Sequence, residues 1–250
     1  MIVRGGRALK DAYDKLVAGD IFIGTVSGKY IKDALLIDLA QRGVYCLPAP
    51  LAQKLNSSRT AQAKLLGRFM VPDTRVIDRR TVLMETINAY HRRGIKTVVT
   101  KQEHMHCGYG VRYWSDLEML YNVTALDKNV YPFVIQPFVK DFLDVRVIVV
   151  DDYIEVYGRQ NKDNFRQNIA VGGRVIPFEL NAATERFCKD IMARGRFPFA
   201  HIDLMMKNDK KCYLSEIALN GGIKGAVINR ADLEAKKKNA LEKLAGEIKI

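Results

Sequence analysis

The alternation of apolar and polar positions predicts a β-hairpin near the C-terminal end of the chain. Segment 201–206 is rich in apolar residues, and the polar positions 208–210 separate it from a returning segment, 212–217. Side chains alternate between the two faces of a strand, so the loop length decides which of them share a face. A loop of two or four residues places Asp203 and Glu216 on one face, whereas a loop of three separates them.

Two carboxylates on one face repel each other unless a cation lies between them or one of them keeps its proton. Oxygen ligands of this kind suit Mg²⁺, which substrate phosphates usually complete. The segment Asn220-Gly221-Gly222, followed by Lys224-Gly225, predicts a turn without bulky side chains, which a phosphate can approach closely. The hairpin and turn together indicate a site for metal and phosphate. The alternative is two unrelated acids on solvated strands.

The remaining pattern predicts a mixture of helices and strands, with many strands joined as hairpins. Strands outnumber what a doubly wound sheet needs, so mixed α+β lobes are expected. The segment Pro48-Ala49-Pro50 is the best candidate for a linker. We expect helices over 7–18, 27–42 (capped by Ser27), 58–68 (capped by Ser57 or Ser58), 81–93, from 115 onward, 181–194 and 229–244, and strands over 19–26, 44–47, 73–78, 95–101, 131–139, 144–150 and 153–160.

Composition fits an ordinary globular protein, with 48% hydrophobic and 27% charged residues in 250. No apolar run has the length needed to span a bilayer, and the first residues lack the apolar core of a signal peptide. The four cysteines are scattered without a CxxC pair, which is typical of free thiols, so a cytoplasmic location is expected. The net charge of +12 indicates an anionic partner, namely a nucleotide, an acidic peptide or nucleic acid.

Lys101 ends an apolar strand and precedes a loop that contains Gly108-Tyr109-Gly110. A lysine beside such a loop can meet phosphate oxygens together with backbone N–H groups, although lysines at strand ends are common. The same loop holds His104, His106 and Cys107, which could bind a soft metal. Nothing nearby supplies a fourth ligand at a known spacing, which disfavours that reading.

Arg146 stands in a strand whose neighbours are valine and isoleucine, so it should meet an acid or a phosphate. One reading is a salt bridge to Asp144 or Glu155. The other is a basic clamp over a triphosphate, opposite the acids of the hairpin. A basic cluster follows, and aromatic residues between its members could also bind single-stranded nucleic acid. The cluster comprises Arg159, Lys162, Arg166 and Asn168, with Tyr153, Tyr157 and Phe165 interleaved.

The order of these parts resembles the ATP-grasp superfamily, and within it the RimK-like glutamate ligases. The parts are a capped helix, a strand-end lysine before GYGV, VIQPF, DVRVIVV, NFRQN followed by GG, and the D…E hairpin before a glycine turn, over about residues 55–226. The resemblance implies a mixed α+β and α/β ATP-grasp fold in which two lobes clamp ATP. We expect a short N-terminal α/β lobe over 1–50, a first ATP-grasp lobe over 51–135 and a second over 136–250.

Members of that family use ATP and Mg²⁺ to phosphorylate a carboxylate, and an amine then displaces the phosphate. The resemblance assigns each predicted site residue a role. Lys101, Gly108, Gly110 and Arg59 would contact ATP, the last where a family lysine is expected; Gln136, Pro137, Phe138 and Val139 would hold the adenine, largely through backbone groups; Asp144 would lie near the nucleotide; Arg146, Arg166 and Asn168 would face the phosphates; and Asp203 and Glu216 would bind Mg²⁺.

This sequence departs from the family at the metal motif, which usually reads Glu-x-Asn and here reads Glu216-Ile217-Ala218. Alanine cannot bind a metal, so either Asn220 or water takes the vacated position, and we expect water and phosphate. The departure keeps two rivals open, an ATP-binding protein without ligase activity and a basic nucleic-acid-binding module. Basic character suggests an acidic acceptor, while the identity of the carboxylate and the amine stays open.

Overall fold

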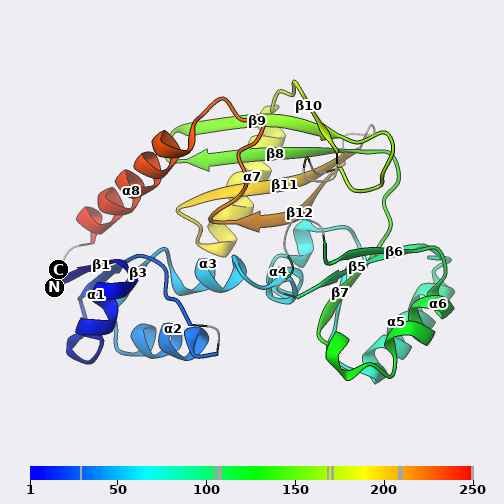
Figure 1. Cartoon of the computed structure of the whole chain (residues 1–250), viewed down its shortest axis with the longest axis horizontal. Coiled ribbons are helices and arrows are strands. Elements are labelled where there is room, and N and C mark those ends of the chain that lie inside the picture. The colour runs from blue at the N-terminus through cyan, green and yellow to red at the C-terminus, as the bar shows by residue number, and fades with distance from the viewer. Residues whose placement is uncertain are drawn as a thin grey trace.

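The computed structural model describes residues 1–28, 30–103, 105, 109–167, 169, 172–207 and 211–248. In this part of the chain there are three sheets, with strand orders β1-β2-β3, β4-β7-β5-β6 and β10-β9-β8-β11-β12. Figure 1 shows the five-stranded sheet lying between the N-terminal lobe on one side and the four-stranded sheet on the other. The predicted mixed α/β character is confirmed, while the exact lobe boundaries stay a prediction.

The N-terminal lobe is a small parallel sheet, as the βαβ-like pattern predicts. Its strands are β1 (Ile2–Arg4), β2 (Ile21–Ile23) and β3 (Tyr45–Leu47), and its helices are α1 (Gly5–Ala12) and α2 (Lys32–Gln41). Ser27 does not cap α2, because the helix begins five residues later and has no side-chain cap. The expected linker is also short, because α3 (Pro50–Leu55) begins at its last proline, where a fixed φ suits the first turn of a helix.

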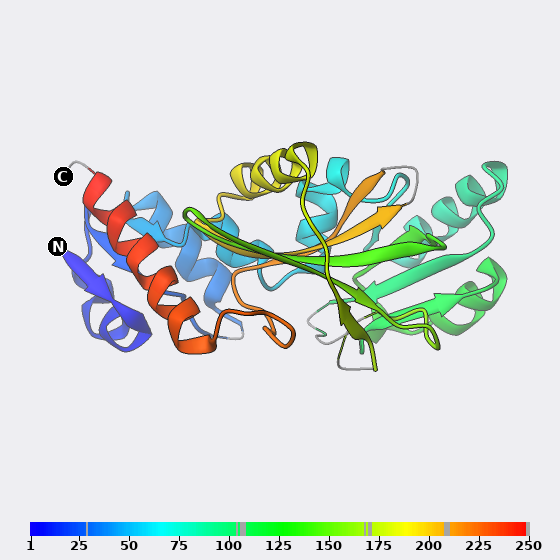
Figure 2. The same ribbon diagram turned by 90° about the horizontal axis from the view of Figure 1, so that it is seen from above.

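The four-stranded sheet is antiparallel and is built from β4 (Arg75–Ile77), β5 (Val98–Gln102), β6 (Val111–Trp114) and β7 (Phe133–Pro137). Helices α5 (Arg80–Arg92) and α6 (Leu117–Thr124) cover one face of this sheet and bury its core residues (Figure 2). Helix α4 (Arg59–Leu65) precedes the sheet, and the Ser58 side chain accepts a hydrogen bond from the Ala61 N–H, as expected of a cap.

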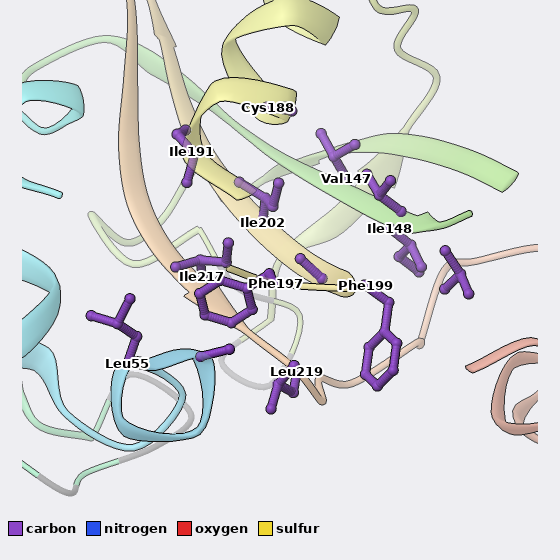
Figure 3. Close-up of a cluster of buried hydrophobic side chains, with 14 of the residues drawn as sticks. Leu55, Val147, Ile148, Cys188, Ile191, Phe197, Phe199, Ile202, Ile217 and Leu219 are labelled. Atoms are coloured by element: carbon purple, nitrogen blue, oxygen red, sulfur yellow. The ribbon is translucent and has the colours of Figure 1, made fainter. Parts of the chain in front are cut away.

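The five-stranded sheet is antiparallel throughout and carries different chemistry on its two faces. Its strands are β8 (Phe142–Val150), β9 (Tyr153–Gln160), β10 (Arg174–Ile176), β11 (Phe199–Lys207) and β12 (Cys212–Ala218). Helix α7 (Ala182–Gly195) packs on one face, where Ile202 of β11, Ile217 of β12 and Ile191 of the helix meet (Figure 3). Asp203 and its neighbours at odd positions of β11 therefore face the other way.

The hairpin of β11 and β12 corrects the parity rule drawn from the sequence. Met206 pairs with Cys212, and the Lys207 N–H donates to the Lys211 carbonyl, so the loop inside this last hydrogen-bonded pair has three residues, 208–210, which lie outside the described residues. That length alone would put the two acids on opposite faces. A β-bulge shifts the register between Asp203 and Leu204, and Asp203 stands directly opposite Glu216. A bulge inserts one unpaired residue, so it restores the shared face.

The final helix, α8 (Arg230–Glu247), is capped by Asn229, whose side chain accepts a hydrogen bond from the Asp232 N–H. It runs back from the five-stranded sheet to the N-terminal lobe (Figure 1), where Glu242 of α8 accepts hydrogen bonds from Arg4 of β1. Lys237 of α8 is 3% exposed and lies over the Phe199 ring at 5.4 Å. The helix therefore contacts the same face of the five-stranded sheet on which Asp203 lies.

Candidate active site

A cavity of about 530 Å³ lies between the four-stranded and five-stranded sheets. Its apolar end is formed by side chains of both sheets and of the connection between them, and its charged end by the middle of the five-stranded sheet. The apolar lining includes Val99, Phe138, Val139, Phe142 and Met205. A pocket with one apolar wall and a few convergent charges is the usual form of a cofactor site.

Asp203 is the centre of the charged end, because two arginines of neighbouring strands bind it. Arg146, its cross-strand partner, donates from Nε and Nη2 to the two carboxylate oxygens, each at 2.7 Å. Arg159 Nη2 lies 3.0 Å from Asp203 and 2.7 Å from Asp144. Burial alone raises the pKa of Asp203, but the two arginines outweigh it and hold that pKa well below its usual range.

Asp144 shows the opposite balance. Its pKa is raised to about 6, because burial raises it by more than Arg159 lowers it. Of the two partners predicted for Arg146, neither Asp144 nor Glu155 is the acid that it binds. The arginine meets Asp203 instead, because β8 and β11 place the two side chains directly opposite each other.

Glu216, the other predicted metal ligand, forms an ion pair with Arg59 of α4 at 2.6 Å. The two acids therefore face one cavity without repelling each other, because each has an arginine partner. In the described part of the chain no three His, Cys, Asp or Glu side chains are assembled as a metal site. The two carboxylates fit Mg²⁺ as a pair of oxygen ligands, and a cation held there would take its other ligands from water and phosphate.

Lys101 of β5 is the charged residue that the four-stranded sheet contributes to the cavity. Its side chain lines the cavity at 9% exposure, and Nζ donates to the Ser215 carbonyl oxygen at 3.2 Å. Ser215 is the bulged residue of β12, so its carbonyl is available to the lysine. The pKa of Lys101 is lowered to about 8, mainly by burial and also by Arg59, and the nearby carboxylates only partly offset these two effects.

Three cationic side chains hold the turn 220–222 through its oxygen atoms. Lys237 donates to Asn220 Oδ1 at 2.8 Å, Arg230 to the Gly221 carbonyl at 3.1 Å and Arg146 to the Gly222 carbonyl at 2.7 Å. The backbone N–H groups of the two glycines have no acceptor among the described residues. The turn therefore presents free donors near the cavity, and the Asn220 carboxamide oxygen is already bound.

The segment 161–167 packs against the four-stranded sheet at the apolar end of the cavity. Arg166 donates from Nη2 to the Val111 carbonyl of β6 at 2.5 Å, and its guanidinium lies 4.3 Å from the centre of the Phe165 ring. Phe165 also packs against Phe138 and Tyr113. The predicted basic segment thus bridges the two lobes over the cavity.

His201 is a site residue that the motif comparison does not include. It lines the cavity at 3% exposure, and neither ring nitrogen has a hydrogen-bond partner among the described residues. The pKa of His201 is lowered to about 3, mainly by burial and also by Lys237 and Arg146, so the imidazole is neutral. Strand alternation could have found it, because it lies two residues before Asp203 on the same face.

The structure brings most of the predicted site residues together around one cavity. Gly110 and Pro137 do not line it, and Gly108 and Asn168 lie outside the described residues, as do His104, His106 and Cys107. Tyr157 and Arg159 of the predicted basic cluster also line the cavity, although the family resemblance gave them no role there, and Ser215 lines it without having been predicted. The predicted residues that line it are Arg59, Lys101, Gln136, Phe138, Val139, Asp144, Arg146, Arg166, Asp203, Glu216 and Asn220.

Two sheets that enclose a cavity with a lysine on one side and a carboxylate pair on the other are the arrangement expected of an ATP-grasp fold, and solved structures of ATP-grasp ligases share this fold. D-alanine–D-alanine ligase from Bacillus anthracis complexed with ATP is similar in structure, with a TM-score of 0.64 and 17% identity over 97% of this chain and 84% of that one. D-cycloserine synthetase DcsG is similar with a TM-score of 0.63 and 10% identity over 90% and 84%.

A third similar structure is the ATP-grasp ligase PsnB with a phosphomimetic precursor variant, Mg and ADP, with a TM-score of 0.59 and 14% identity over 87% of this chain and 79% of that one. No curated protein matches the chain in sequence. Residues 53–240 match the RimK-like ATP-grasp domain, and the chain belongs to that family. The resemblance, the fold and the ligase class are therefore confirmed, with ATP and Mg²⁺ as the family's cofactors.

No helix in the described part of the chain is both long enough and apolar enough to cross a membrane.

Proposed function

We propose that this protein joins a carboxylate to an amine through an acyl phosphate, with ATP as the phosphoryl donor. The observation that carries the proposal is the meeting of Lys101 with Asp203 and Glu216 in one cavity, although they come from different sheets. A lysine aimed at a carboxylate pair from across a cleft suits a metal–triphosphate complex, which carries both signs of charge.

The charge of the lining supports a polyanionic ligand. Six cationic and three acidic side chains line the cavity, an excess of three positive charges. Low-dielectric walls strengthen the attraction of such an excess for an anion. The cationic members are Arg59, Lys101, Arg146, Arg159, Arg166 and Lys224, and the acidic members are Asp144, Asp203 and Glu216.

The arrangement of polar and apolar walls orients the nucleotide in this proposal. The apolar end beside Phe138 and Val139 receives the adenine, and Lys101 and Arg146 receive the phosphates. Asp203 and Glu216 would hold Mg²⁺, which when bound neutralises phosphate charge. Ala218 presents a methyl group toward the site, and Lys237 binds the Asn220 side chain. The protein therefore supplies two side-chain ligands, and water and phosphate complete the shell.

The chemistry needs two displacements at the charged end of the cavity. A carboxylate oxygen of the substrate bonds to the γ-phosphorus, and the bond to the bridging oxygen breaks to release ADP. The amine nitrogen then bonds to the acyl carbon, the carbon–oxygen bond breaks, and phosphate leaves while the amine loses a proton. Arg146 and the free N–H groups of the turn 220–222 are donors placed beside the charge that develops.

The test is ADP formation in the presence and absence of candidate substrates. We expect ADP formation to require a carboxylate. We also expect added hydroxylamine to trap the acyl phosphate as a hydroxamate. ADP formation that is indifferent to any carboxylate or amine, despite tight ATP binding, would favour the second candidate, an ATP-binding protein without ligase activity. The Lys237–Asn220 hydrogen bond is the observation behind that candidate, because it occupies the side chain that could replace the missing family asparagine.

A further inference from the structure

The buried imidazole of His201 has no role in the nucleotide site described above. The ring lies on the cavity face of β11, beyond Asp203 as one moves away from Met205 and the apolar end. A nucleotide with its base at the apolar end and its phosphates at Asp203 would therefore end before the ring. The space beside His201 belongs to the part of the cavity where the other substrates must lie.

Small residues make room for the ring. Ala218 is its direct cross-strand partner on β12, and a Cβ atom added at Gly221 would lie 2.8 Å from Nδ1. That contact is closer than real Cβ atoms allow, so any side chain at position 221 would displace the imidazole. The missing family asparagine at position 218 and the presence of His201 are thus two parts of one local arrangement.

An unpartnered imidazole is costly in a buried place. A buried polar atom left without a partner loses its hydrogen bonds to water and gains none in return, and native structures keep such atoms mainly where a ligand or a function uses them. Both ring nitrogens of His201 are in this state. A neutral imidazole has one N–H to donate and one lone pair to accept.

The surroundings select an anion as the partner. Lys237, Arg146 and Arg230 lie around the ring and act on its charge, and Asp203, the acid among the described residues that does so, is already bound by two arginines. The turn 220–222 covers the ring, and the same three cations hold this turn through its oxygen atoms. An anion in the cavity beside this turn would meet the same cations and, at the ring, a donor that has no other partner among the described residues.

We propose that His201, beneath the turn 220–222, donates a hydrogen bond to a carboxylate of the substrate and so sets the affinity for it. This inference rests on the proposed function, because it places the nucleotide at the other end of the cavity. The shared chemistry is that of an oxyanion, which could also come from phosphate. The ligand is a carboxylate because the phosphates of a nucleotide lie short of the ring.

The test uses the full chain labelled with ¹⁵N-histidine, with a non-hydrolysable ATP analogue and Mg²⁺ present throughout. Succinate and inorganic phosphate are added separately, and the ring nitrogens are followed by long-range ¹H–¹⁵N spectra. The His201 signals are assigned by their loss in His201→Gln. We expect succinate to shift these signals and phosphate to leave them unchanged. Signals that respond to phosphate alone, or to neither, would overturn the proposal.

Two variants separate binding from a purely structural role. His201→Leu should weaken succinate binding on the order of 10- to 100-fold, the usual loss for a hydrogen bond to a charged group. It should also raise the melting temperature of the free protein, because it removes two unpartnered nitrogens. His201→Gln keeps a donor and should retain most of the affinity. His91→Gln, on the exposed face of α5, is the matched control and should change neither quantity.

The outcomes distinguish this inference from the proposed function. Unchanged succinate affinity in His201→Leu, or a lower melting temperature in both His201 variants, would show that the ring is structural. Normal binding of the ATP analogue with no succinate effect on the ring would defeat this inference and leave the nucleotide site intact. Failure of the wild-type protein to bind the analogue would defeat the proposed function instead.

Discussion

The four-stranded and five-stranded sheets face the same cavity but contribute to it in different ways. The four-stranded sheet supplies apolar side chains and one buried cation, Lys101, whose nearest partner is a backbone carbonyl of the other sheet. The five-stranded sheet supplies a network in which Asp203 is bound by Arg146 and Arg159. On the four-stranded sheet the charge of Lys101 is met, among the described residues, only by a backbone carbonyl. On the five-stranded sheet the acids and the arginines neutralise each other.

This difference separates what each sheet can do when a ligand arrives. A lysine without an acidic partner gains its partner from the ligand, so its contribution is affinity. Carboxylates paired with arginines must exchange those partners for a metal ion, so their contribution depends on Mg²⁺ and phosphate arriving together. The comparison predicts that substitution of Lys101 on the four-stranded sheet changes ATP binding, whereas substitutions of the acids on the five-stranded sheet change turnover.

The largest effect is expected from the hairpin acids. Glu216→Gln should abolish Mg²⁺-dependent ATP turnover, because the carboxylate charge holds a cation whose contribution to the transition state is several kcal/mol. The ion pair of Glu216 with Arg59 is half-buried, so the fold should survive. Turnover and thermal melting are measured together. Full turnover in the variant would show that this acid does not hold the metal.

Asp203→Asn should also abolish turnover, but it should lower stability as well. The substitution leaves Arg146 and Arg159 buried without their shared carboxylate, and breaking a buried pair typically costs about 3–5 kcal/mol. Chemical denaturation of this variant against Glu216→Gln measures the difference. Equal stability of the two variants would contradict the asymmetry between a buried network and a half-buried pair.

Lys101→Ala should weaken ATP binding by about 1.5–3 kcal/mol, the value of a hydrogen bond to a charged group. The matched control is Lys96→Ala, an exposed lysine just before the same strand. Calorimetric titration with ATP compares the two variants with the wild-type protein. Unchanged ATP affinity in Lys101→Ala would show that the four-stranded sheet does not bind the phosphates through this lysine.

The lowered pKa of Lys101 predicts that ATP affinity depends on pH. Its pKa is lowered to about 8 in the free protein, and an anionic phosphate favours the charged form, which raises that pKa in the complex. ATP affinity should therefore be constant below pH 8 and fall as the pH rises above it, by at most about tenfold per pH unit. Titrations in buffers of different ionisation enthalpy should show proton uptake there. An ATP affinity that stays constant from pH 7 to 9, in the wild-type protein and in Lys101→Ala alike, would contradict this role of Lys101.

The smallest effect concerns the substituted metal motif. Ala218→Asn should lower, by a few-fold, the Mg²⁺ concentration for half-maximal turnover, because it restores a side-chain oxygen beside Glu216. Asn220→Ala should change it little, since Lys237 already binds that side chain. Magnesium titrations of turnover compare the two variants. The opposite ranking would make Asn220 the metal ligand.

Sequence reasoning predicted the helices and strands around the site because their patterns are local. Strands β5, β7, β8, β9, β11 and β12 and the capped helix α4 all fall within or close to their predicted ranges. It missed α3, β1, β6 and β10, which are short and carry little periodicity. It also placed the cap of α2 too early.

The site was less predictable than the fold because contacts between strands decide it. Asp203 and Glu216 share a face through the bulge at Ser215, and nothing in the spacing of the hairpin signals that bulge. Arg146 selects Asp203 over Asp144 because of the register of β8 with β11. His201 was overlooked because no family motif includes it, although its place in the strand alternation was visible.

A structure of the protein with a non-hydrolysable ATP analogue and Mg²⁺ tests the central claim most directly. The predicted result has the adenine beside Phe138 and Val139, the phosphates on Lys101 and Arg146, and a Mg²⁺ ion bound by Asp203 and Glu216 with water and phosphate oxygens. A nucleotide bound outside this cavity, or phosphates that contact only one of the two sheets, would contradict the account.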